Sequence, residues 1–495
     1  LTGTELVTNG DFATDSDWIK GNAWTISDGS ASCDGTQTAG FLIRQPSLAL
    51  GTGKIFKITF QLKDYQAGSL ISANLEGTGF VDFQNINANG TYVAYSGLST
   101  GDNFISFKAD ADFTGSITNV SVQEIQTDVP RIDFTDDPTG HLLLEPQSTN
   151  LVLNSNDLTN STWAKNQATA SSSTIINPKG TSGASLYTCS NYTGNNQYFR
   201  INPNTTYSND VSYNYSMFVK YNTFQFCKLT YVNFGNQEHF TAVFDVINGT
   251  VTANNSSGSP QNTNANIQDF GNGWFRISIS AAITSSGFNP MNFEFNKVPS
   301  GTPTFTANNG RTDQTTTTND KIYVYGAQLE QKSYPTSYIP TSGSAVTRNQ
   351  ETCNNSGTVN DFNSEEGVLY AEIAALADDG TYKYISLSDG TQESAVAIRF
   401  SPTSNQILVF IKNSGAFTSV MLTTSYNTIN FNKIAISYKV NDFSFWINGV
   451  KVATDTSGNT FSSDTLTKLA FNDGGVGNPF YGKTKNVKAF KRALT

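Results

Sequence analysis

The feature that most constrains the fold of this chain is a period-two alternation of polar and apolar residues that recurs along its length. Residues 54–62 (KIFKITFQL), 274–280 (WFRISIS) and 433–438 (KIAISY) all show it. Successive side chains of a β-strand point to opposite faces, so this pattern is typical of strands with one buried face. The one weak helical candidate, residues 366–376, has the Val-Leu-Tyr-Ala content of a strand. The sequence therefore predicts an all-β protein.

Asn-Gly dipeptides at 89–90, 248–249 and 448–449 mark tight turns in this pattern. Asn-Gly is favoured in two-residue hairpins because both residues adopt positive φ at low cost. The third lies within residues 443–453 (FSFWINGVKVA), which read as strand, turn and strand. Only 14% of the residues are charged and 40 are glycine, where an ordinary soluble domain is about 25% charged. We predict tandem antiparallel β-sandwiches joined by polar loops.

An internal repeat sets the number of sandwiches. Residues 6–12 (LVTNGDF) precede Trp18, and residues 151–157 (LVLNSND) precede Trp163 at the same spacing. The two segments also end alike, with VSVQE and VYGAQLE in the strand that closes each one. Such a repeat indicates two related domains followed by a third of different sequence.

Two proline-containing stretches separate these domains. Proline fixes φ and lacks a backbone donor, so such stretches are predicted to be extended connectors rather than sheet interiors. The apolar run 142–144 predicts that the first connector packs against a domain. The predicted organisation is a first domain at 1–128, a connector at 129–149, a second domain at 150–333, a connector at 334–349 and a third domain at 350–495.

Charge and hydropathy exclude two classes of partner. The formal net charge is −10, and basic residues cluster only within 483–492, so no nucleic-acid partner is expected. No run of 18 apolar residues occurs, so no membrane span is expected. No signal peptide is visible, which leaves secretion open if one has been removed.

The four cysteines show neither a CxxC pair nor histidine neighbours at metal spacing. A zinc site is therefore not expected. Four free thiols are predicted, with a Cys189–Cys227 bridge as the alternative.

No catalytic motif surrounds the two histidines, His141 and His239, and both are expected on solvated strands. The pair Glu365 and Glu366 directly precedes a strand, where acids are solvated. Tyr198, Arg200 and His239 are residue types that a polysaccharide lyase uses, but the sequence does not place them together. The chain is predicted not to be an enzyme.

Aromatic side chains are better candidates for function, because the C–H faces of sugar rings stack on them. Trp18 and Trp163 occupy equivalent repeat positions, which favours a role in the core. Trp446 alternates with Phe445, so one of the two faces outward. The candidate carbohydrate-binding residues are Trp24, Tyr65, Tyr198, Tyr221 and Trp446.

Five segments resemble parts of known families. The opening LVTNGDF with Trp18 resembles the first strand of carbohydrate-binding-module jelly rolls. The hairpin at 446–449 and the closing segment 480–494 resemble the concanavalin A-like, laminin-G-type sandwich. These resemblances imply two jelly rolls followed by a concanavalin A-like sandwich. The phrases at 143–151 (LLEPQSTNL) and 326–341, with GAQLE and YPTSYIPT, resemble structural proteins of phages and prophages.

Carbohydrate-binding jelly rolls of this type often carry an acidic residue directly after the phenylalanine of the first strand, near a structural calcium. Ala13 occupies that position here. Asp11, Asp15 and Asn119 remain as oxygen ligands, which is fewer than the six to eight that calcium takes. Calcium is left unassigned, and no other cofactor is predicted.

These features together lead to one main hypothesis. The chain is predicted to be a non-enzymatic virion surface protein, such as a tail fibre, an appendage or a capsid-decorating fibre, or else an extracellular protein. It would bind host glycans or another virion component, and the resemblance implies a homo-oligomer, with a trimer favoured. The alternatives are a secreted polysaccharide lyase or glycosidase with binding modules, and a purely architectural virion protein without a ligand. Fold by itself does not decide among them.

Overall fold

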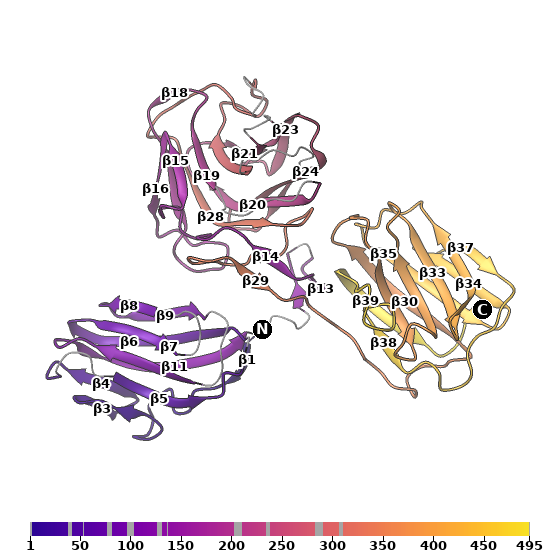
Figure 1. Cartoon of the computed structure of the whole chain (residues 1–495), viewed down its shortest axis with the longest axis horizontal. Helices are drawn as coiled ribbons and strands as arrows, with labels where there is room; N and C mark the ends of the chain where they lie inside the picture. The colour runs from indigo at the N-terminus through magenta and orange to yellow at the C-terminus, as the bar shows by residue number, and fades with distance from the viewer. Residues whose placement is uncertain are drawn as a thin grey trace. The chain divides into compact units, whose positions relative to one another are not determined.

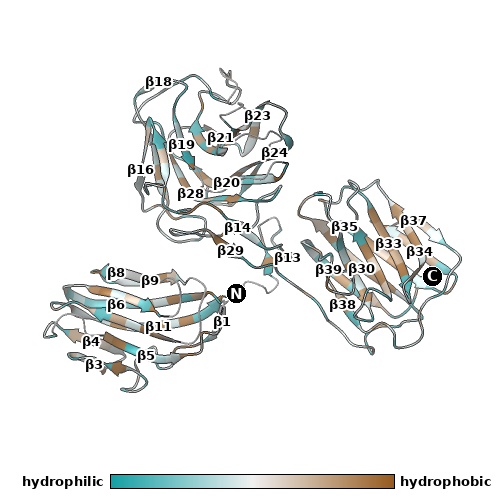
Figure 2. Ribbon diagram, in the orientation of Figure 1, coloured by the Kyte–Doolittle hydropathy of each residue, from teal (hydrophilic) through white to brown (hydrophobic). Residues whose placement is uncertain are grey.

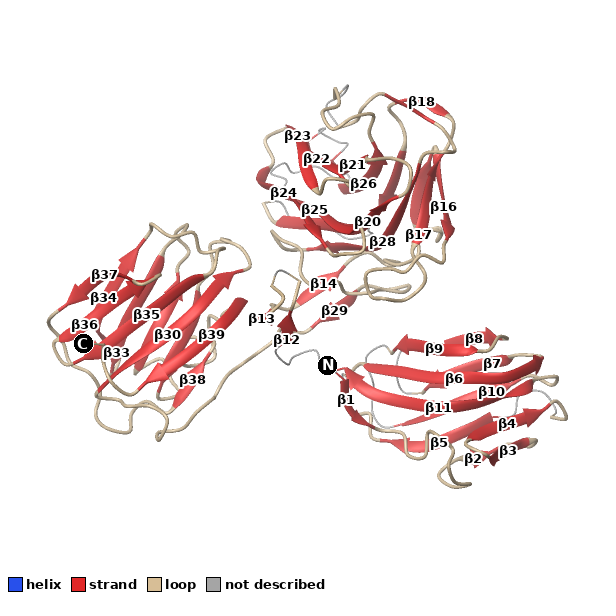
Figure 3. Cartoon of the chain, turned by 180° about the vertical axis from the view of Figure 1, so that it is seen from behind, coloured by secondary structure: helices blue, strands red, loops and turns tan. Residues whose placement is uncertain are grey.

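The computed structural model describes residues 2–494 except 38–41, 53, 77–81, 97–102, 126–130, 136, 202–209, 234–237, 283–290 and 306–309. Every regular element in these residues is a β-strand, and the paired strands are antiparallel (Figure 3). The predicted all-β fold class is therefore confirmed. The chain forms two compact units, Leu1–Val129 and Pro130–Thr495. The described residues contain no helix long and apolar enough to cross a membrane.

The first unit is one sandwich of two sheets (Figure 1). One sheet has the order β3 (Trp24–Ser27), β4 (Ser30–Asp34), β11 (Thr114–Ile125), β6 (Phe56–Ala67) and β9 (Gly90–Tyr95), with β1 (Thr2–Glu5) also paired to β11. The other has the order β2 (Ile19–Lys20), β5 (Leu42–Leu48), β10 (Asn103–Ala109), β7 (Leu70–Leu75) and β8 (Asp82–Ile86). The alternation predicted for residues 54–62 is realised in β6, where every second side chain from Phe56 to Leu62 is buried.

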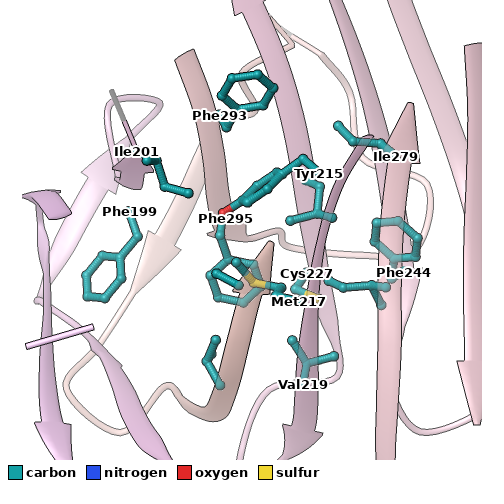
Figure 4. Packing of buried hydrophobic residues seen from close by; sticks show 14 of the residues in the cluster. Phe199, Ile201, Tyr215, Met217, Val219, Cys227, Phe244, Ile279, Phe293 and Phe295 are labelled. Atoms are coloured by element: carbon teal, nitrogen blue, oxygen red, sulfur yellow. The ribbon is translucent and has the colours of Figure 1, made fainter. Parts of the chain in front are cut away.

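The second unit contains two sandwiches, and the first of them is larger than the sandwich of the first unit. One sheet has the order β16 (Ala168–Ser172), β17 (Ser185–Cys189), β28 (Lys321–Glu330), β20 (Ser212–Tyr221), β25 (Trp274–Ala282) and β24 (Gln261–Asp269). The other has the order β15 (Trp163–Asn166), β19 (Tyr198–Ile201), β26 (Met291–Lys297), β21 (Phe226–Asn233), β22 (Glu238–Asp245) and β23 (Thr250–Ser257). A small ribbon of β18 (Tyr192–Gly194) and β27 (Gln314–Thr316) flanks them. Aromatic residues such as Phe199, Tyr215 and Phe295 fill the space between the sheets (Figure 4).

The first and second sandwiches have the same strand order. If β23 and β24 are left out, the five strands of each sheet in the second sandwich match those of the first in chain order and in position. Apart from β1 of the first sandwich and the β18–β27 ribbon of the second, the two sandwiches differ by one inserted pair, β23 and β24, which adds an edge strand to each sheet. The sequence repeat reflects this shared architecture.

The repeated tryptophans perform the same structural task in both sandwiches. Trp18 Nε1 donates a hydrogen bond to the carbonyl oxygen of Asn9 at 3.1 Å, and Trp163 Nε1 donates to that of Asn154 at 3.0 Å. Both rings are buried in their cores, as their equivalent positions predicted. The backbone pairing beside them also repeats, because Leu6 N donates to Val122 O and Leu151 N donates to Leu329 O.

This equivalence predicts equal effects of two substitutions. Trp18→Phe and Trp163→Phe each remove a buried donor and leave a carbonyl oxygen without its partner, which costs about 2 kcal/mol. Denaturant unfolding of the two single variants should show similar losses, each confined to the unit that carries the change. A neutral result for either one would contradict a shared structural role.

The third sandwich completes the second unit. Its larger sheet has the order β12 (Arg131–Asp133), β13 (His141–Leu144), β39 (Gly482–Phe490), β30 (Glu366–Ala375), β35 (Asn432–Lys439), β36 (Asp442–Ile447) and β37 (Val450–Asp455). The smaller has the order β34 (Ala416–Thr423), β33 (Ile407–Asn413), β32 (Ala395–Phe400), β31 (Lys383–Ser388) and β38 (Lys468–Ala470). Figure 2 shows apolar residues recurring along several of these strands. The Asn448-Gly449 turn between β36 and β37 has φ of 51° and 83°, as the dipeptide predicted.

The segment predicted as a connector at 129–149 is part of this third sandwich. Its β13 pairs with both β12 and β39, so it lies inside a sheet and not beside one. Leu144 is 1% exposed and belongs to the core of the third sandwich. Pro138 and Pro146, which suggested a connector, fall between strands and therefore remove no donor from the ladder. Residues 129, 130 and 136 lie outside the described residues.

A buried polar junction joins the two predicted connectors. Glu145 accepts from Arg131, from Arg348 at 2.5 Å and from the backbone N–H of Ser337 at 2.8 Å. Glu351 accepts from Arg131 and from the backbone N–H of Glu145. A ribbon of β14 (Ser148–Asn150) and β29 (Val346–Arg348) runs beside this network. Buried charges of this kind are tolerated because each one is paired.

The segments at 143–151 and 326–341 form the other hydrogen bonds of this junction. Asn150 Nδ2 donates to the carbonyl oxygens of Ala327 and Ile339 at 3.1 and 2.7 Å. Glu330 accepts from Ser148 Oγ at 2.6 Å and from Thr336 N at 3.0 Å. Each segment therefore supplies hydrogen bonds that attach the chain after β28 to the chain before β15.

Candidate functional site

The five predicted aromatic residues do not form one platform. Trp24 is 4% exposed and packs in the core of the first sandwich against Phe113, so its ring is not available to a ligand in this structure. It alternates with exposed Thr25 in β3, and the inward-facing set of that strand includes Ile26. The prediction that Trp24 binds a sugar is corrected accordingly. Tyr65 is half-buried at the end of β6, and its hydroxyl donates to Gly68 O at 2.9 Å.

Tyr221 and Trp446 lie on different sandwiches. Tyr221 ends β20 and is 43% exposed. Trp446 is the outward member of its pair, because Phe445 is fully buried. Lys451 Nζ lies 4.8 Å from the centre of the Trp446 ring, and Trp446 Nε1 donates to Ser444 Oγ at 2.9 Å. Carbohydrate binding by Tyr221 and by Trp446 stays a prediction, with each residue acting as a single contact point.

Tyr198 leads to a richer site. It belongs to β19, whose next outward residue, Arg200, is directly opposite Glu294 on β26. In the following strands Thr230 is opposite Glu294, and Thr241 is opposite Thr230. We call the outward side chains of this sheet, together with the loop residue Arg311, the basic face. Its members are Tyr198, Arg200, Lys228, Thr230, His239, Thr241, Asn255, Glu294, Asn296 and Arg311.

Cations gather around one carboxylate in this face. Arg200 donates to Glu294 Oε1 through Nε at 3.0 Å and through its terminal nitrogen at 2.7 Å. Arg311 reaches the same oxygen at 3.5 Å. The Arg200 guanidinium also lies 3.9 Å from the centre of the Tyr198 ring, which covers that face of the ring. Tyr198 therefore positions an arginine instead of offering that face to a sugar.

The interior of the basic face holds polar atoms without partners. Glu294 is 0% exposed and Asn296 is 1% exposed. Their Oε2 and Oδ1 atoms have no hydrogen-bond partner among the described residues, and neither does Oγ1 of Thr312, which is 2% exposed. Unsatisfied buried acceptors are uncommon in native proteins because each one costs free energy. Each of these atoms can accept a hydrogen bond from a ligand hydroxyl or from water.

A loop lies close over this face. Lys228 Nζ donates to the carbonyl oxygen of Gly310, and Gly310 has a φ of 68°. A Cβ atom at Gly310 would lie 2.0 Å from Thr241 Oγ1, so only glycine fits there without displacing the loop. His239 Nε2 and Asn255 Oδ1 are 2.7 Å apart on the same face.

Lys228 is the most perturbed cation of the site. It is 1% exposed, and burial, together with the nearby Arg311, lowers its pKa to about 8 although Glu294 acts in the opposite direction. Because the folded pKa lies below the unfolded value of about 10.4, the charged lysine opposes folding below pH 8. That penalty is relieved as the pH rises from about 8 to about 10.4.

The free energy of unfolding of the native chain should therefore gain up to about 1.4 kcal/mol per pH unit in this window from Lys228. Urea unfolding of the native chain and of Lys228→Met at several pH values isolates the contribution of Lys228. Tyrosines and thiols titrate in both proteins, so their effects cancel in the difference between the two free energies of unfolding. The difference between the two free energies should change in favour of the native chain as the pH rises. A pH-independent difference would contradict the buried charge.

The first sandwich lacks this chemistry at the equivalent place. Ile19 pairs with Arg44 as Ala164 pairs with Arg200, so the two arginines occupy the same register. The residue opposite Arg44 is Ser106 where Glu294 stands in the second sandwich. Arg44 lies 5.1 Å from the centre of the Phe104 ring. Of these two equivalent positions, only the one in the second sandwich holds a buried carboxylate.

Sequence reasoning missed Lys228, Glu294 and Arg311. A signal was present, because Lys228 alternates with apolar residues in β21 and Glu294 stands between two phenylalanines in β26. A charge in a strand of otherwise apolar pattern indicates either an exposed face or a buried site. The pattern by itself does not distinguish them.

The residues weighed for calcium have other partners. Asp15 pairs with Lys20 at 2.6 Å, and Asn119 Nδ2 donates to Gln61 Oε1 at 3.2 Å. No group of three or more His, Cys, Asp or Glu side chains in the described part of the chain is placed to hold a metal ion.

The four cysteines are free thiols, so the Cys189–Cys227 bridge does not form. Burial raises the pKa of Cys33 to about 11 and that of Cys189 to about 12. Thiols of such high pKa are weak nucleophiles and poor metal ligands at neutral pH.

Comparisons with known proteins give likenesses of structure only. No protein-family model matches the chain, and no curated protein matches it. The chain is similar to sheep galectin-11 in complex with glycerol, at 8% identity over 28% of this chain and 96% of that one, with a TM-score of 0.20. It is also similar to the CBM22-1–CBM22-2 tandem domain of Paenibacillus barcinonensis Xyn10C, at 10% identity over 67% and 98%, with a TM-score of 0.24. Mouse laminin α1 domains LG4-5 match at 7% identity over 62% and 90%, with a TM-score of 0.21.

Proposed function

We propose that this chain is a non-enzymatic carbohydrate-binding protein whose second sandwich binds an acidic glycan on the basic face. The observation that carries the proposal is the pairing of two chemistries in one place. Beneath the partly exposed arginines, Glu294 Oε2 and Asn296 Oδ1 are buried acceptors without a partner among the described residues, and each can accept a hydrogen bond from ordered water or from a sugar hydroxyl that replaces it. Arg200 and Arg311, 18% and 15% exposed in their side chains, suit a carboxylate or sulfate group.

A glycan array containing uronate and sulfated chains beside neutral ones tests this proposal. The double variant Arg200→Ala/Arg311→Ala should bind acidic glycans at least tenfold more weakly, since hydrogen bonds to charged groups are each worth about 1.5–3 kcal/mol. The matched control is Arg44→Ala, which removes the equivalent arginine of the first sandwich and should leave binding unchanged. Absence of any acidic hit, or an equal loss in the control, would reject the basic face as the binding site.

We further propose that the protein is displayed on a virion surface as a homo-oligomeric fibre or appendage, with a trimer favoured. The support is the resemblance of residues 143–151 and 326–341 to phage and prophage structural proteins. Proteomic analysis of purified particles and sedimentation of the isolated protein test this part. A strictly monomeric protein that no particle contains would contradict it. Ordered placement in a particle without any glycan hit would favour a purely architectural role.

A second candidate function is polysaccharide lysis. Tyr198, Arg200 and His239, which are residue types suited to a lyase, are all outward residues of one sheet in the structure. Incubation with uronate polysaccharides, followed by measurement of unsaturated and reducing ends, distinguishes this function from binding. Product formation that disappears in His239→Ala would favour an enzyme and overturn the non-enzymatic proposal.

A further inference from the structure

The other sheet of the second sandwich carries an uncharged polar surface at its edge strand. In β24 the exposed residues Asn264 and Asn266 alternate with Ala265 and Ile267, which pack against the core. Because successive residues of a strand face opposite ways, the two amides lie on the outer face of the sheet. Asn264 and Asn266 are two residues apart on the strand, so both can contact the same side of a ligand that extends along β24.

The neighbouring strands continue this surface inward. Ser280 on β25 is opposite Asn264, and Ser278 is opposite Asn266. On β20, Asn214 is opposite Ser280. This part of the outer face is therefore a field of amides and hydroxyls, whereas Arg276 and the apolar cluster of Phe218, Trp274 and Tyr325 occupy the next part of the same face.

Two cavities lie over this field. One has a volume of about 580 Å³ and the other of about 970 Å³. Asn264, Tyr334, Leu376 and Ile429 line both, so the cavities form one continuous groove, which we call the amide groove. The amide strand β24 lines it, together with residues 331–338 and residues of the third sandwich.

Within the described residues, one buried polar atom without a partner lines the amide groove, and a second lies on the neighbouring strand β20. Ser280 is 1% exposed and lines the larger cavity, and its Oγ has no hydrogen-bond partner among the described residues. The Oδ1 atom of Asn214, 2% exposed and opposite Ser280, has none either. A hydroxyl-rich ligand both donates and accepts, so it can satisfy a serine hydroxyl and an amide oxygen together.

The charged side chains that line the two cavities are equal in number: four cations (Lys179, Arg276, Lys332 and Lys483) and four carboxylates (Asp133, Glu145, Asp378 and Asp379). Arg276 donates to Thr336 O at 2.7 Å and to Ser216 Oγ at 3.0 Å. Asp379 is paired with Lys383 at 2.5 Å. The lining therefore carries no formal net charge, which suits an uncharged ligand better than an ionic one. Phe270, Tyr334 and Tyr338 also line the smaller cavity and add the aromatic surface on which sugar C–H faces pack.

We propose that the amide groove is a second carbohydrate site, separate from the basic face, and that it binds an uncharged, extended oligosaccharide along β24. The site goes beyond the proposed function, because its residues lie on the opposite sheet and would recognise an uncharged glycan instead of an acidic one. A chain with both sites binds an acidic and a neutral glycan through one sandwich.

Isothermal titration of the full chain with cellohexaose, xylohexaose and mannohexaose tests this inference. At least one should bind, and Asn264→Ala/Asn266→Ala should weaken binding about tenfold, since two neutral hydrogen bonds are lost. Both asparagines are exposed, so the double variant should fold. Ser280→Ala should weaken binding severalfold without lowering the melting temperature, because the hydroxyl has no protein partner to lose.

Two controls separate this site from the basic face. Asn254→Ala removes an exposed asparagine from β23, the edge strand of the other sheet, and should leave neutral binding unchanged. Arg200→Ala/Arg311→Ala should also leave it unchanged while it abolishes acidic binding. The inference is overturned if no hexasaccharide binds, or if either control weakens binding as much as the β24 variant. Loss of self-association in the β24 variant, without any sugar binding, would overturn it in favour of β24 pairing between two copies.

Discussion

Replacing Glu294 by glutamine is expected to lower the free energy of unfolding by about 3–5 kcal/mol. The substitution keeps the shape of the side chain but removes the carboxylate that Arg200 and Arg311 share. Lys228 also loses the charge that favours its protonated form, so its pKa should fall below the value of about 8. The change leaves Lys228, Arg200 and Arg311 close together without a counter-charge, and unpaired buried charge is strongly destabilising.

Chemical denaturation of the native chain and the variant measures this effect. The double variant Glu294→Gln/Lys228→Met provides the control, because it removes one of the cations left without a partner. It should recover part of the lost stability, whereas independent effects would simply add. A loss below about 1 kcal/mol for Glu294→Gln would show that the basic face is solvated enough to screen its charges.

The second large effect concerns a residue outside the predicted third domain. Leu144→Asp is expected to destabilise the third sandwich by about 4 kcal/mol or more, because it places an unpaired charge in a fully buried position. Leu144 is 1% exposed and belongs to the core formed by β30 to β36, although more than 200 residues of chain separate it from them. Loss of its packing should also release β13 from the edge of β39.

Hydrogen exchange resolved by peptide measures this result, because it reports on each sandwich separately. Exchange should rise in β39 and β30, while the first sandwich keeps its protection. The control is Ile132→Asp in the neighbouring strand β12, where the side chain is 56% exposed and the change should be tolerated. Unchanged exchange in β39 for Leu144→Asp would mean that the third sandwich is stable without the strand from residues 141–144.

Local patterns predicted the elements and several of their details. The alternation in β6, the Asn-Gly turn at 448–449 and the core positions of Trp18 and Trp163 depend on interactions within a few residues or on repetition. The same logic failed for Trp24, whose alternation with Thr25 was compatible with either face. Which face of a strand becomes buried is decided by the sheet that packs against it.

The candidate sites required contacts between distant strands. Arg200 and Glu294 are 94 residues apart and meet because β19 and β26 pair in one register. Nothing near either residue specifies that register. The amide groove likewise combines β24 with residues 331–338 and with Leu376 and Ile429 of the third sandwich.

The sequence by itself determined that this protein is all-β, that it contains a repeated sandwich, and that residues 448–449 form a tight turn. These properties follow from the period of the side chains and from the backbone preferences of single residues. Only the tertiary structure decided that residues 141–144 complete the third sandwich, and that three cations gather around Glu294. Strand pairing joins residues of any separation, so its partners are selected by the whole packed sheet and not by local sequence.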